Sequence, residues 1–302
     1  MKRRASRTSV LVMALTIGSL VGLAPTAGAA AGGGSRILFE RIAPDGSVDL
    51  WAMDGAGGRQ ALFLEDAADA DFAPSGRRIA FDRSWATEPP DIFVSDVDGS
   101  NVVRLTDEPG FDFFPDWSPD GQRITFTSDR DGKPDIYAMA ADGSDVRRIT
   151  DEPNGAQGSE YSPDGRGILI TTVASGIPQV AVVDADGGTP VVLTDGPDFE
   201  PTWSPDGRHI AFISARDGTR ELYVMTADGT DQTRLSADAF PDVGPPAFAP
   251  SGNVVAFMSL RAGNWDIYSS SLAPKTGETR RLTTDSAIEG FPEWRQGALV
   301  RP

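Results

Sequence analysis

One arrangement of apolar and polar residues recurs along the whole chain. Each copy begins with an aromatic residue, and five of the six continue into a turn of the type Ser-Pro-Asp-Gly or Ala-Pro-Ser-Gly. The aromatic residues are spaced 42 to 46 positions apart, at Phe72, Trp117, Tyr161, Trp203, Phe248 and Trp294. Proline presets the first backbone angle of such a turn and glycine supplies a positive φ at its end, so each turn joins two strands of a hairpin. A fixed period of this length indicates a repeat architecture.

Each copy predicts four short strands. The first ends at the aromatic residue, and the second follows the turn as an alternating run such as residues 123–126, which has the period of a half-buried strand. A third strand, such as residues 135–138, leads to an Asp-Gly turn, and a fourth ends in a pair such as Ile149-Thr150. Four antiparallel strands in about 40–45 residues match one blade of a β-propeller.

The two ends of the chain complete one blade between them. Residues 37–39, 49–53 and 60–63 resemble strands two, three and four of a blade that lacks its first strand. The missing first strand is found near the other end, in residues 290–294. The sequence therefore predicts an all-β protein, a six-bladed β-propeller of four-stranded antiparallel blades. The ring is closed by pairing of the N- and C-terminal strands in the sixth blade, which leaves no open sheet edge at the closure.

The same motifs resemble a known repeat. Ser-Pro-Asp-Gly, Ile-Ala-Phe, Ser-x-Arg-Asp-Gly, Asp-Ile-Tyr, Asp-Gly and Leu-Thr in this order are similar to the TolB-type propeller repeat of bacterial envelope proteins. The resemblance extends from Arg36 to Pro302, a TolB-like β-propeller domain over residues 36–302. It implies a propeller that works in the cell envelope.

The first 30 residues have the order of a secretory signal peptide. Lys2, Arg3, Arg4 and Arg7 precede an apolar run over residues 10–24, and Ala27-Gly28-Ala29 follows. This apolar run is shorter than the roughly 20 residues that a membrane-spanning helix needs. We therefore predict a signal peptide at residues 1–30 and a flexible lead-in at 31–35. The protein is expected to be exported to the periplasm or the extracellular space, without stable membrane insertion.

Charge narrows the class of partner. The formal net charge is −17, and removal of the four positive charges of the signal peptide lowers it to −21. Such a surface repels nucleic acid and anionic lipid, whereas it attracts cations and basic segments. The chain contains no cysteine, so its stability depends on a core that a monomer of this size can bury.

Candidate binding residues lie on one face of the predicted ring. The connections between blades and the turns between strands two and three share this face, which we call the mouth face, around the central channel. Residues present in most blades are expected to serve packing. Arg130, Arg216 and Arg261 are such residues, and we expect them to pair with neighbouring loop carboxylates. Departures from the repeat and acidic loop positions are the candidates for ligand or partner binding: Asp112, Phe113, Phe114, Glu160, Asp198, Glu200, Arg216 and Glu289. The alternative for Phe113 and Phe114 is burial between blades.

The sequence contains few residues that could carry out catalysis. His209 is the single histidine, and no Gly-x-Ser-x-Gly motif is present. Residues 129–135 place acids at alternating positions but lack the late glutamate of a calcium loop, so a turn is preferred to a metal site. We therefore expect no catalytic residues, no cofactor and no metal.

The predicted function is that of a non-enzymatic propeller that binds a protein, peptide or glycan of the cell envelope at its acidic mouth face. Two alternatives stay open. One is a carbohydrate-active enzyme, a hydrolase or lyase that uses loop carboxylates such as Glu160 and Glu200. The other is a component of a Tol-like envelope transport system.

Overall fold

The computed structural model describes residues 35–83, 89–236, 240–272 and 279–295. All regular elements within these ranges are β-strands. In this part of the chain no helix is long and apolar enough to cross a membrane. The predicted signal peptide and the lead-in up to residue 34 lie outside the described residues.

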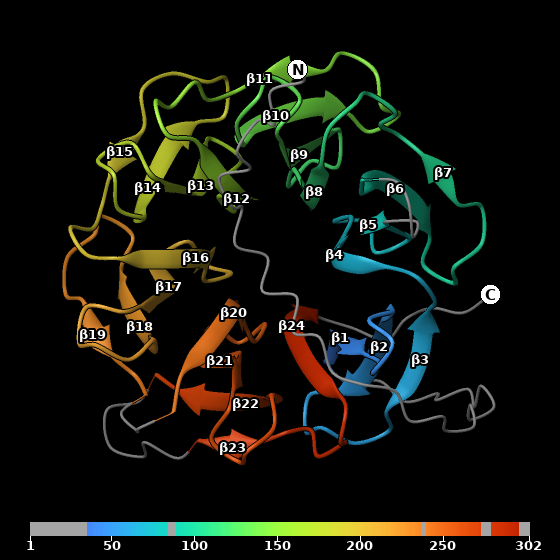
Figure 1. Cartoon of the computed structure of the whole chain (residues 1–302), viewed down its shortest axis with the longest axis vertical. Coiled ribbons are helices and arrows are strands. Elements are labelled where there is room, and N and C mark those ends of the chain that lie inside the picture. The colour runs from blue at the N-terminus through green and yellow to red at the C-terminus, as the bar shows by residue number, and fades with distance from the viewer. Residues whose placement is uncertain (1–34, 84–88, 237–239, 273–278, 296–302) are drawn as a thin grey trace, which may run out of the picture.

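Six four-stranded antiparallel sheets are arranged as blades around a central channel (Figure 1). Blade one contains β4 (Ala68–Phe72), β5 (Arg78–Arg83), β6 (Asp91–Asp96) and β7 (Val103–Arg104). Blade two contains β8 (Asp112–Trp117), β9 (Arg123–Ser128), β10 (Asp135–Ala140) and β11 (Arg147–Arg148). Blade three contains β12 (Ala156–Tyr161), β13 (Gly167–Thr172), β14 (Gln179–Asp184) and β15 (Val191–Val192). In each blade the first strand lines the channel and the fourth lies at the outer rim (Figure 1).

The ring continues through three further blades. Blade four contains β16 (Asp198–Trp203), β17 (His209–Ser214), β18 (Glu221–Thr226) and β19 (Thr233–Arg234). Blade five contains β20 (Asp242–Phe248), β21 (Val254–Ser259), β22 (Asp266–Ser271) and β23 (Arg280–Arg281). The sixth, which we call the seam blade, contains β24 (Ile288–Arg295), β1 (Arg36–Ile42), β2 (Val48–Asp54) and β3 (Ala61–Leu64).

The seam blade confirms the predicted closure. Its strands are ordered β24-β1-β2-β3. Ile37 lies opposite Trp294, and Arg36 lies opposite Arg295, in an antiparallel register. Strands from the two ends of the chain therefore form one sheet, and the ring has no unpaired inner edge at this point.

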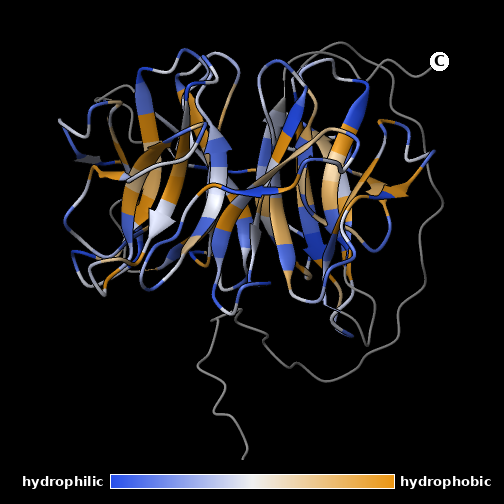
Figure 2. Ribbon diagram, turned by 90° about the horizontal axis from the view of Figure 1, so that it is seen from above, coloured by the Kyte–Doolittle hydropathy of each residue, from blue (hydrophilic) through white to orange (hydrophobic). Residues whose placement is uncertain are grey.

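The hydrophobic core lies between blades. One cluster joins Ile92 and Val94 of blade one to Trp117 and Phe126 of blade two. Because each blade is covered by a neighbour on both faces, the second strands are buried along nearly their whole length, including Thr125 with no exposed surface. The expectation of half-buried second strands is therefore wrong. Figure 2 shows the apolar stretches in the middle of the strands and polar residues toward the two ends of the blades.

The turns between strands one and two pack against one another around the face opposite the mouth. In blade two, the Gly121 amide donates to the Ser118 carbonyl at 2.8 Å, which closes the predicted turn. An atom placed at the Cβ position of Gly121 would lie 3.7 Å from Pro74 of the preceding blade. Gly165 and Pro119 repeat this contact one blade further on. These contacts fix the spacing of neighbouring blades at this face.

Two glycines of the seam blade, Gly57 and Gly46, show by comparison how closely this blade packs against blade five. Gly57 has a φ of +85°, and a Cβ atom there would lie 2.2 Å from the Leu282 carbonyl oxygen of blade five. Gly46 has a similar φ of +87° with nothing within 4 Å. We expect Gly46→Ala to lower the free energy of unfolding by about 1–2 kcal/mol, the cost of the backbone conformation. Gly57→Ala should cost about 1–3 kcal/mol more because the blades must move apart. Urea denaturation measures both, and equal losses would contradict this packing.

Candidate functional site

Four blades carry an ion pair at the mouth end of the channel strand. In blade two, Arg130 Nη2 lies 2.8 Å from Asp112 Oδ2. In blade four, Arg216 Nη2 lies 2.7 Å from Asp198 Oδ2. Blade five pairs Arg261 with Asp242, and the seam blade pairs Arg41 with Glu289. Thus four of the predicted site residues, Asp112, Asp198, Arg216 and Glu289, form ion pairs within blades.

These ion pairs are buried. The Asp112, Asp198 and Glu289 carboxylates have between 0 and 1% of their surface exposed. Removing one partner of a buried pair leaves the other charge uncompensated, which strongly destabilises a fold. The structure therefore places these carboxylates where they support the blades and keeps them out of the open part of the mouth.

The predicted aromatic residues of blade two lie at an irregular point of the channel strand. Phe113 and Phe114 are half-buried, and their rings meet edge to face with centroids 4.9 Å apart. Phe114 has a φ of +55°, and the strand register shifts between Phe113 and Asp116. This β-bulge turns the following residues toward the channel.

The bulge is repeated in the channel strands around the ring. A residue with positive φ occupies the equivalent position in every blade: Asp69, Phe114, Gly158, Glu200, Gly244 and Phe291. The sequence gives no sign of this feature, because only two of the six are glycine. One of them, Glu200, is a predicted site residue.

Glu200 lies at the mouth of blade four. Its buried carboxylate accepts a hydrogen bond from the Gly244 amide, and burial raises its pKa to about 7, although the nearby Arg220 opposes this shift. The Arg220 guanidinium lies 4.8 Å from the centroid of the Phe199 ring. Glu200 Oε2 has no hydrogen-bond partner among the described residues.

Glu160 belongs to a second group of acids, deeper in the channel. The residue before the anchor aromatic is acidic in four of the six repeats: Asp71, Asp116, Glu160 and Glu293. We call these four residues the channel carboxylates. Of these four, only Glu160 is among the residues predicted from the sequence, because residues shared by most blades are expected to serve packing. Their common position before the aromatic is the signal that could have found the others.

The channel carboxylates connect successive blades. Asp71 Oδ2 accepts the Trp117 amide at 2.6 Å, and Asp116 Oδ2 accepts the Tyr161 amide at 2.8 Å. Both oxygens of Glu160 lie 3.2 Å from the Trp203 amide nitrogen. Asp71, Asp116 and Glu160 thus each accept the backbone N–H of the next blade's anchor aromatic.

The channel carboxylates also repel one another. Burial raises the pKa of Asp116 well above its usual value, and the charges of Asp71, Glu160 and Glu293 raise it further. Burial likewise raises the pKa of Glu160 to about 8. For Glu293, burial and then the charges of Asp71 and Glu160 raise the pKa. These residues keep part of their surface exposed to the channel while protein surrounds them, so water solvates them poorly.

A third acidic group lies between the seam blade and blade one. Glu40 and Asp82 are 5 and 6% exposed, and the Asp69 amide donates to Glu40 Oε1 at 2.8 Å. Burial raises the pKa of Glu40 to about 7 and that of Asp82 to about 8. Burial also raises the pKa of Asp69, with additional effects of Glu40 and Asp82. We call this group the seam carboxylates.

The acidic groups favour the binding of cationic groups. The charges that raise the pKa values of Asp116 and Glu293 are all carboxylates. A positive charge in the channel would lower these pKa values and gain attraction in poorly solvated surroundings. Within the described part of the chain, no group of three or more His, Cys, Asp or Glu side chains has an arrangement that could hold a metal ion.

The fold and the channel define the class of protein, a closed six-bladed β-propeller with an acidic channel. The family model of the TolB beta propeller domain matches residues 60–240, and the chain belongs to this family. An uncharacterized protein of Agrobacterium fabrum is 37% identical over 87 residues, which are 28% of this chain and 29% of that protein. The chain thus matches less than a third of this relative.

Solved structures have the same fold. TolB from Acinetobacter baumannii aligns with a TM-score of 0.77 at 23% identity, over 86% of this chain and 66% of the TolB chain. A putative TolB from Agrobacterium tumefaciens aligns with a TM-score of 0.66 at 20% identity, over 88% of this chain and 99% of that chain. At this level of identity the likeness shows the fold, and it confirms the propeller expected from the sequence.

Proposed function

We propose that the protein is an exported, non-enzymatic propeller that binds a basic segment of a protein or peptide of the cell envelope. The segment enters at the mouth face and places a lysine or arginine side chain among the channel carboxylates. Export is supported by the order of basic, apolar and small residues in positions 1–30. An envelope partner is supported by membership of the TolB propeller family.

One observation carries the proposal. Asp116 and Glu293 are poorly solvated, and the neighbouring charges that shift their pKa values are negative. A basic side chain supplies the opposite charge that this part of the channel lacks. Phe113, Phe114 and Glu200 lie toward the mouth on the same channel strands, where they would contact the residues that flank the inserted side chain.

A neutral variant of the channel tests the proposal. We expect a fluorescein-labelled peptide of alternating glycine and lysine to bind the wild-type protein at low ionic strength. The double variant Glu160→Gln and Glu293→Gln should bind at least about ten times more weakly, because a bound lysine favours the ionised carboxylates and a glutamine of the same shape cannot ionise. Fluorescence anisotropy measures the dissociation constants.

A control separates the channel from the net charge of the surface. Asp107→Asn and Glu108→Gln remove the same two charges from exposed residues of a connecting loop, so this variant should bind nearly as well as the wild type. Equal weakening in both double variants, or equal binding of a glycine–glutamate peptide, would contradict a site in the channel.

Three observations distinguish the alternatives. If a glycan rather than a peptide is the ligand, binding should be insensitive to lysine in the probe and competed by envelope polysaccharide. A carbohydrate-active enzyme would release reducing ends from polysaccharide and lose this activity in Glu160→Gln or Glu200→Gln. Genes for energy-coupling envelope proteins beside this one would favour a Tol-like transport component. Both oxygens of Glu160 already accept the Trp203 amide. This hydrogen bonding favours a binding role for the protein over a catalytic one in which Glu160 transfers a proton.

A further inference from the structure

The channel carboxylates differ from the acids at the mouth end in what neutralises them. On β8, Asp112 Oδ2 lies 2.8 Å from Arg130 Nη2, and Asp116 follows four positions later on the same strand. On β24, Glu289 is likewise paired with an arginine, and Glu293 follows four positions later. Within the described ranges, Asp116 and Glu293 form no ion pair with a basic side chain, and the charges that shift their pKa values are those of other carboxylates. The fold therefore neutralises the acids at the mouth end and leaves these two without a positive charge.

The residues opposite the channel carboxylates in the adjacent strands are neutral. Each of the four acids pairs, in the strand register, with a residue of a second strand: Ala80 opposite Asp71, Thr125 opposite Asp116, Leu169 opposite Glu160 and Leu38 opposite Glu293. In blades four and five, Thr202 and Ala247 take the place of the acid before the anchor aromatic. No basic residue stands at any of these positions. Neither the channel strands at this level nor the strands beside them supply a cation to the group.

The Tyr161 hydroxyl is a further titratable group beside Asp116. Burial and then the charge of Asp116 raise the pKa of Tyr161 to about 12, whereas the charges of Arg123 and Arg147 lower it. A phenol with this pKa is uncharged near neutral pH, so it does not compensate the acids. The side chain of Thr202, which hydrogen-bonds Glu160, is neutral as well.

Four ionised carboxylates in an empty channel would be costly. Burial raises the pKa of Asp116, and the charges of Asp71, Glu160 and Glu293 raise it further because like charges repel. Burial also raises the pKa of Glu160 to about 8. Acids that interact in this way bind and release protons as a group and not one by one. Holding protons is the way in which such a group lowers its charge near neutral pH.

We propose that the empty channel holds protons on the channel carboxylates and releases them when the lysine or arginine of a basic segment enters. This inference rests on the proposed function and adds its regulation: acidification of the surroundings weakens binding, and a rise in pH strengthens it. The entering cation replaces the protons, because it supplies the opposite charge and favours the ionised form of the acids. The released protons pass to water or buffer, so atoms and charge balance.

The direction of the effect follows from the proton balance. A carboxyl group that is protonated in the empty channel and ionised beside the ligand releases one proton on binding. The dissociation constant then falls about tenfold for each unit of rising pH, until the pH exceeds the pKa in the empty channel, which is about 8 for Glu160. The lysine side chain keeps its charge throughout, since its pKa is about 10.4. From about pH 5.5 to about pH 7.5 we therefore expect the dissociation constant to fall at least about tenfold.

Isothermal titration calorimetry measures both the affinity and the released protons. The probe is the glycine–lysine peptide without its label and with both ends blocked, so that its only charges are those of lysine. Titrations in phosphate and in imidazole at the same pH and ionic strength differ in heat by the difference in buffer ionisation enthalpy for each proton released. We expect release of about one proton or more near neutral pH.

The outcomes separate this inference from the proposed function. Equal heats in the two buffers, or a dissociation constant that does not change with pH, would overturn the release of protons and leave binding of the basic segment intact. Absence of binding at every pH would contradict the proposed function itself, and the proposed release with it.

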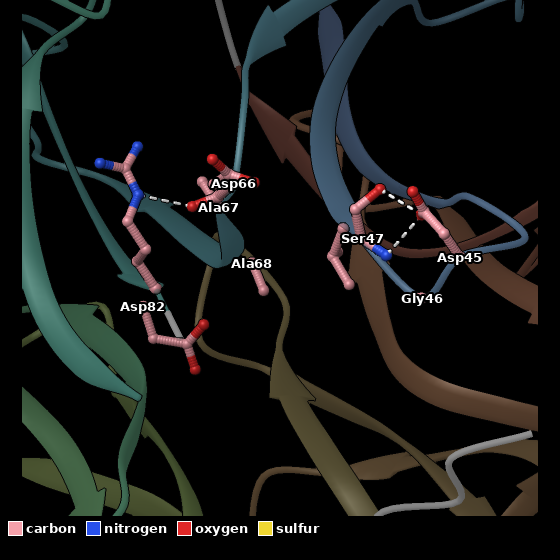
Figure 3. A pocket seen from close by; sticks show the side chains of 9 residues that line it. Asp45, Gly46, Ser47, Asp66, Ala67, Ala68 and Asp82 are labelled. Carbon is pink, nitrogen blue, oxygen red and sulfur yellow. Dashed lines mark hydrogen bonds between the residues drawn. The ribbon is translucent and has the colours of Figure 1, made fainter. Parts of the chain in front are cut away.

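A matched pair of acids locates the protons within the fold. Burial raises the pKa of Glu160, a channel carboxylate, and that of Asp82, a seam carboxylate, to about 8 in both cases. Asp82 lines a pocket of about 400 Å³ between the seam blade and blade one, beside the segment 66–68 (Figure 3). The other groups that shift its pKa are Glu40 and Asp69, which are not channel carboxylates. Asp82→Asn is therefore the control for a buried acid outside the channel.

The variants should differ in the number of protons released. The double variant Glu160→Gln and Glu293→Gln should release at most about half as many protons as the wild type, with a flatter dependence of affinity on pH. If it does not fold, Glu160→Gln alone gives the same comparison with a smaller decrease. Asp82→Asn should release as many protons as the wild type. Undiminished release in the channel variants, or an equal loss in Asp82→Asn, would overturn the assignment.

The single histidine provides a second control. Histidine is the side chain that ordinarily titrates between pH 5 and 8, and His209 begins β17 at the end of blade four opposite the mouth. His209→Gln should leave both the proton release and the pH dependence of binding unchanged. Loss of either in this variant would assign the protons to His209 and overturn the proposal.

Discussion

The free energy of unfolding is expected to fall as the pH rises from about 5 to about 8. The cause is the channel and seam carboxylates, which the fold buries beside one another. Burial raises the pKa of Glu40 to about 7 and those of Glu160 and Asp82 to about 8. In the unfolded chain these groups ionise near pH 4.

The sign follows from proton binding. A carboxyl group whose pKa is higher in the folded state holds its proton where the unfolded chain has already lost it. Its contribution to stability is therefore fully present below about pH 4.5 and is lost as the pH rises through the folded-state pKa. Glu40 alone, with a pKa raised from 4.5 to about 7, corresponds to a loss of about 3 kcal/mol. The other acids of the two groups act in the same direction.

Thermal unfolding at several pH values measures this effect. A loss of about 3 kcal/mol corresponds to a decrease in Tm of about 6–12 °C for a domain of this size. The Glu160→Gln and Glu293→Gln variant should show a smaller decrease, because an amide does not ionise. A Tm that rises between pH 5 and 8 at constant ionic strength would contradict the burial of these acids.

A chain that ends at Ala287 is expected to lose its cooperative fold. This deletion removes β24, which pairs with β1 through six residue pairs on the two sides of a register shift and closes the ring. It exposes the inner edge of β1 and leaves Arg41 without Glu289, its partner in a buried ion pair. The deletion also removes Trp294, which packs against the cluster of Ile37 and Phe39. Losses of this kind exceed the roughly 5–15 kcal/mol that a domain has in total.

A longer truncation provides the control. A chain that ends at Arg295 keeps the whole of β24, and we expect it to unfold cooperatively like the full chain. Near-ultraviolet circular dichroism and urea denaturation compare the two. A cooperative transition of similar midpoint in the chain that ends at Ala287 would show that the ring is stable without its closure.

Much of the fold could be predicted from the sequence, because turns and strands leave local signals. Ser-Pro-Asp-Gly fixes a turn through the chemistry of its own residues, and six regularly spaced anchor aromatics fix the number of blades. The pairing of the Ile37 and Trp294 segments followed from counting strands at the two ends, and the register confirms it. The β-bulges could not be predicted, because Phe114, Glu200 and Phe291 have no intrinsic preference for positive φ.

The candidate site was less accessible to sequence reasoning. Three ion pairs of the mouth end join residues 18 or 19 positions apart, and the Arg41–Glu289 pair joins residues 248 positions apart. The arginine also comes from different positions in different blades: Arg41 lies near the end of a second strand, whereas Arg130 lies two residues beyond one. Glu160 could be predicted because its surroundings depart from the repeat, whereas Asp71, Asp116 and Glu293 stand at a position shared by most blades, where packing is expected. Residues shared by blades converge on the channel axis, so a repeat can build a site as well as a core.

The seam blade has one more consequence. Arg36 and Arg295 lie opposite each other in adjacent strands, so a short linker could join these positions without distorting the sheet. The polypeptide could then be opened at another exposed connection between blades, as in other proteins whose ends lie close together. In such a circular permutant each blade would keep its neighbours and the channel its lining. The order in which the blades emerge during synthesis would change while the closed ring stays the same. Such a permutant would therefore show whether folding depends on the ring itself or on the order of synthesis.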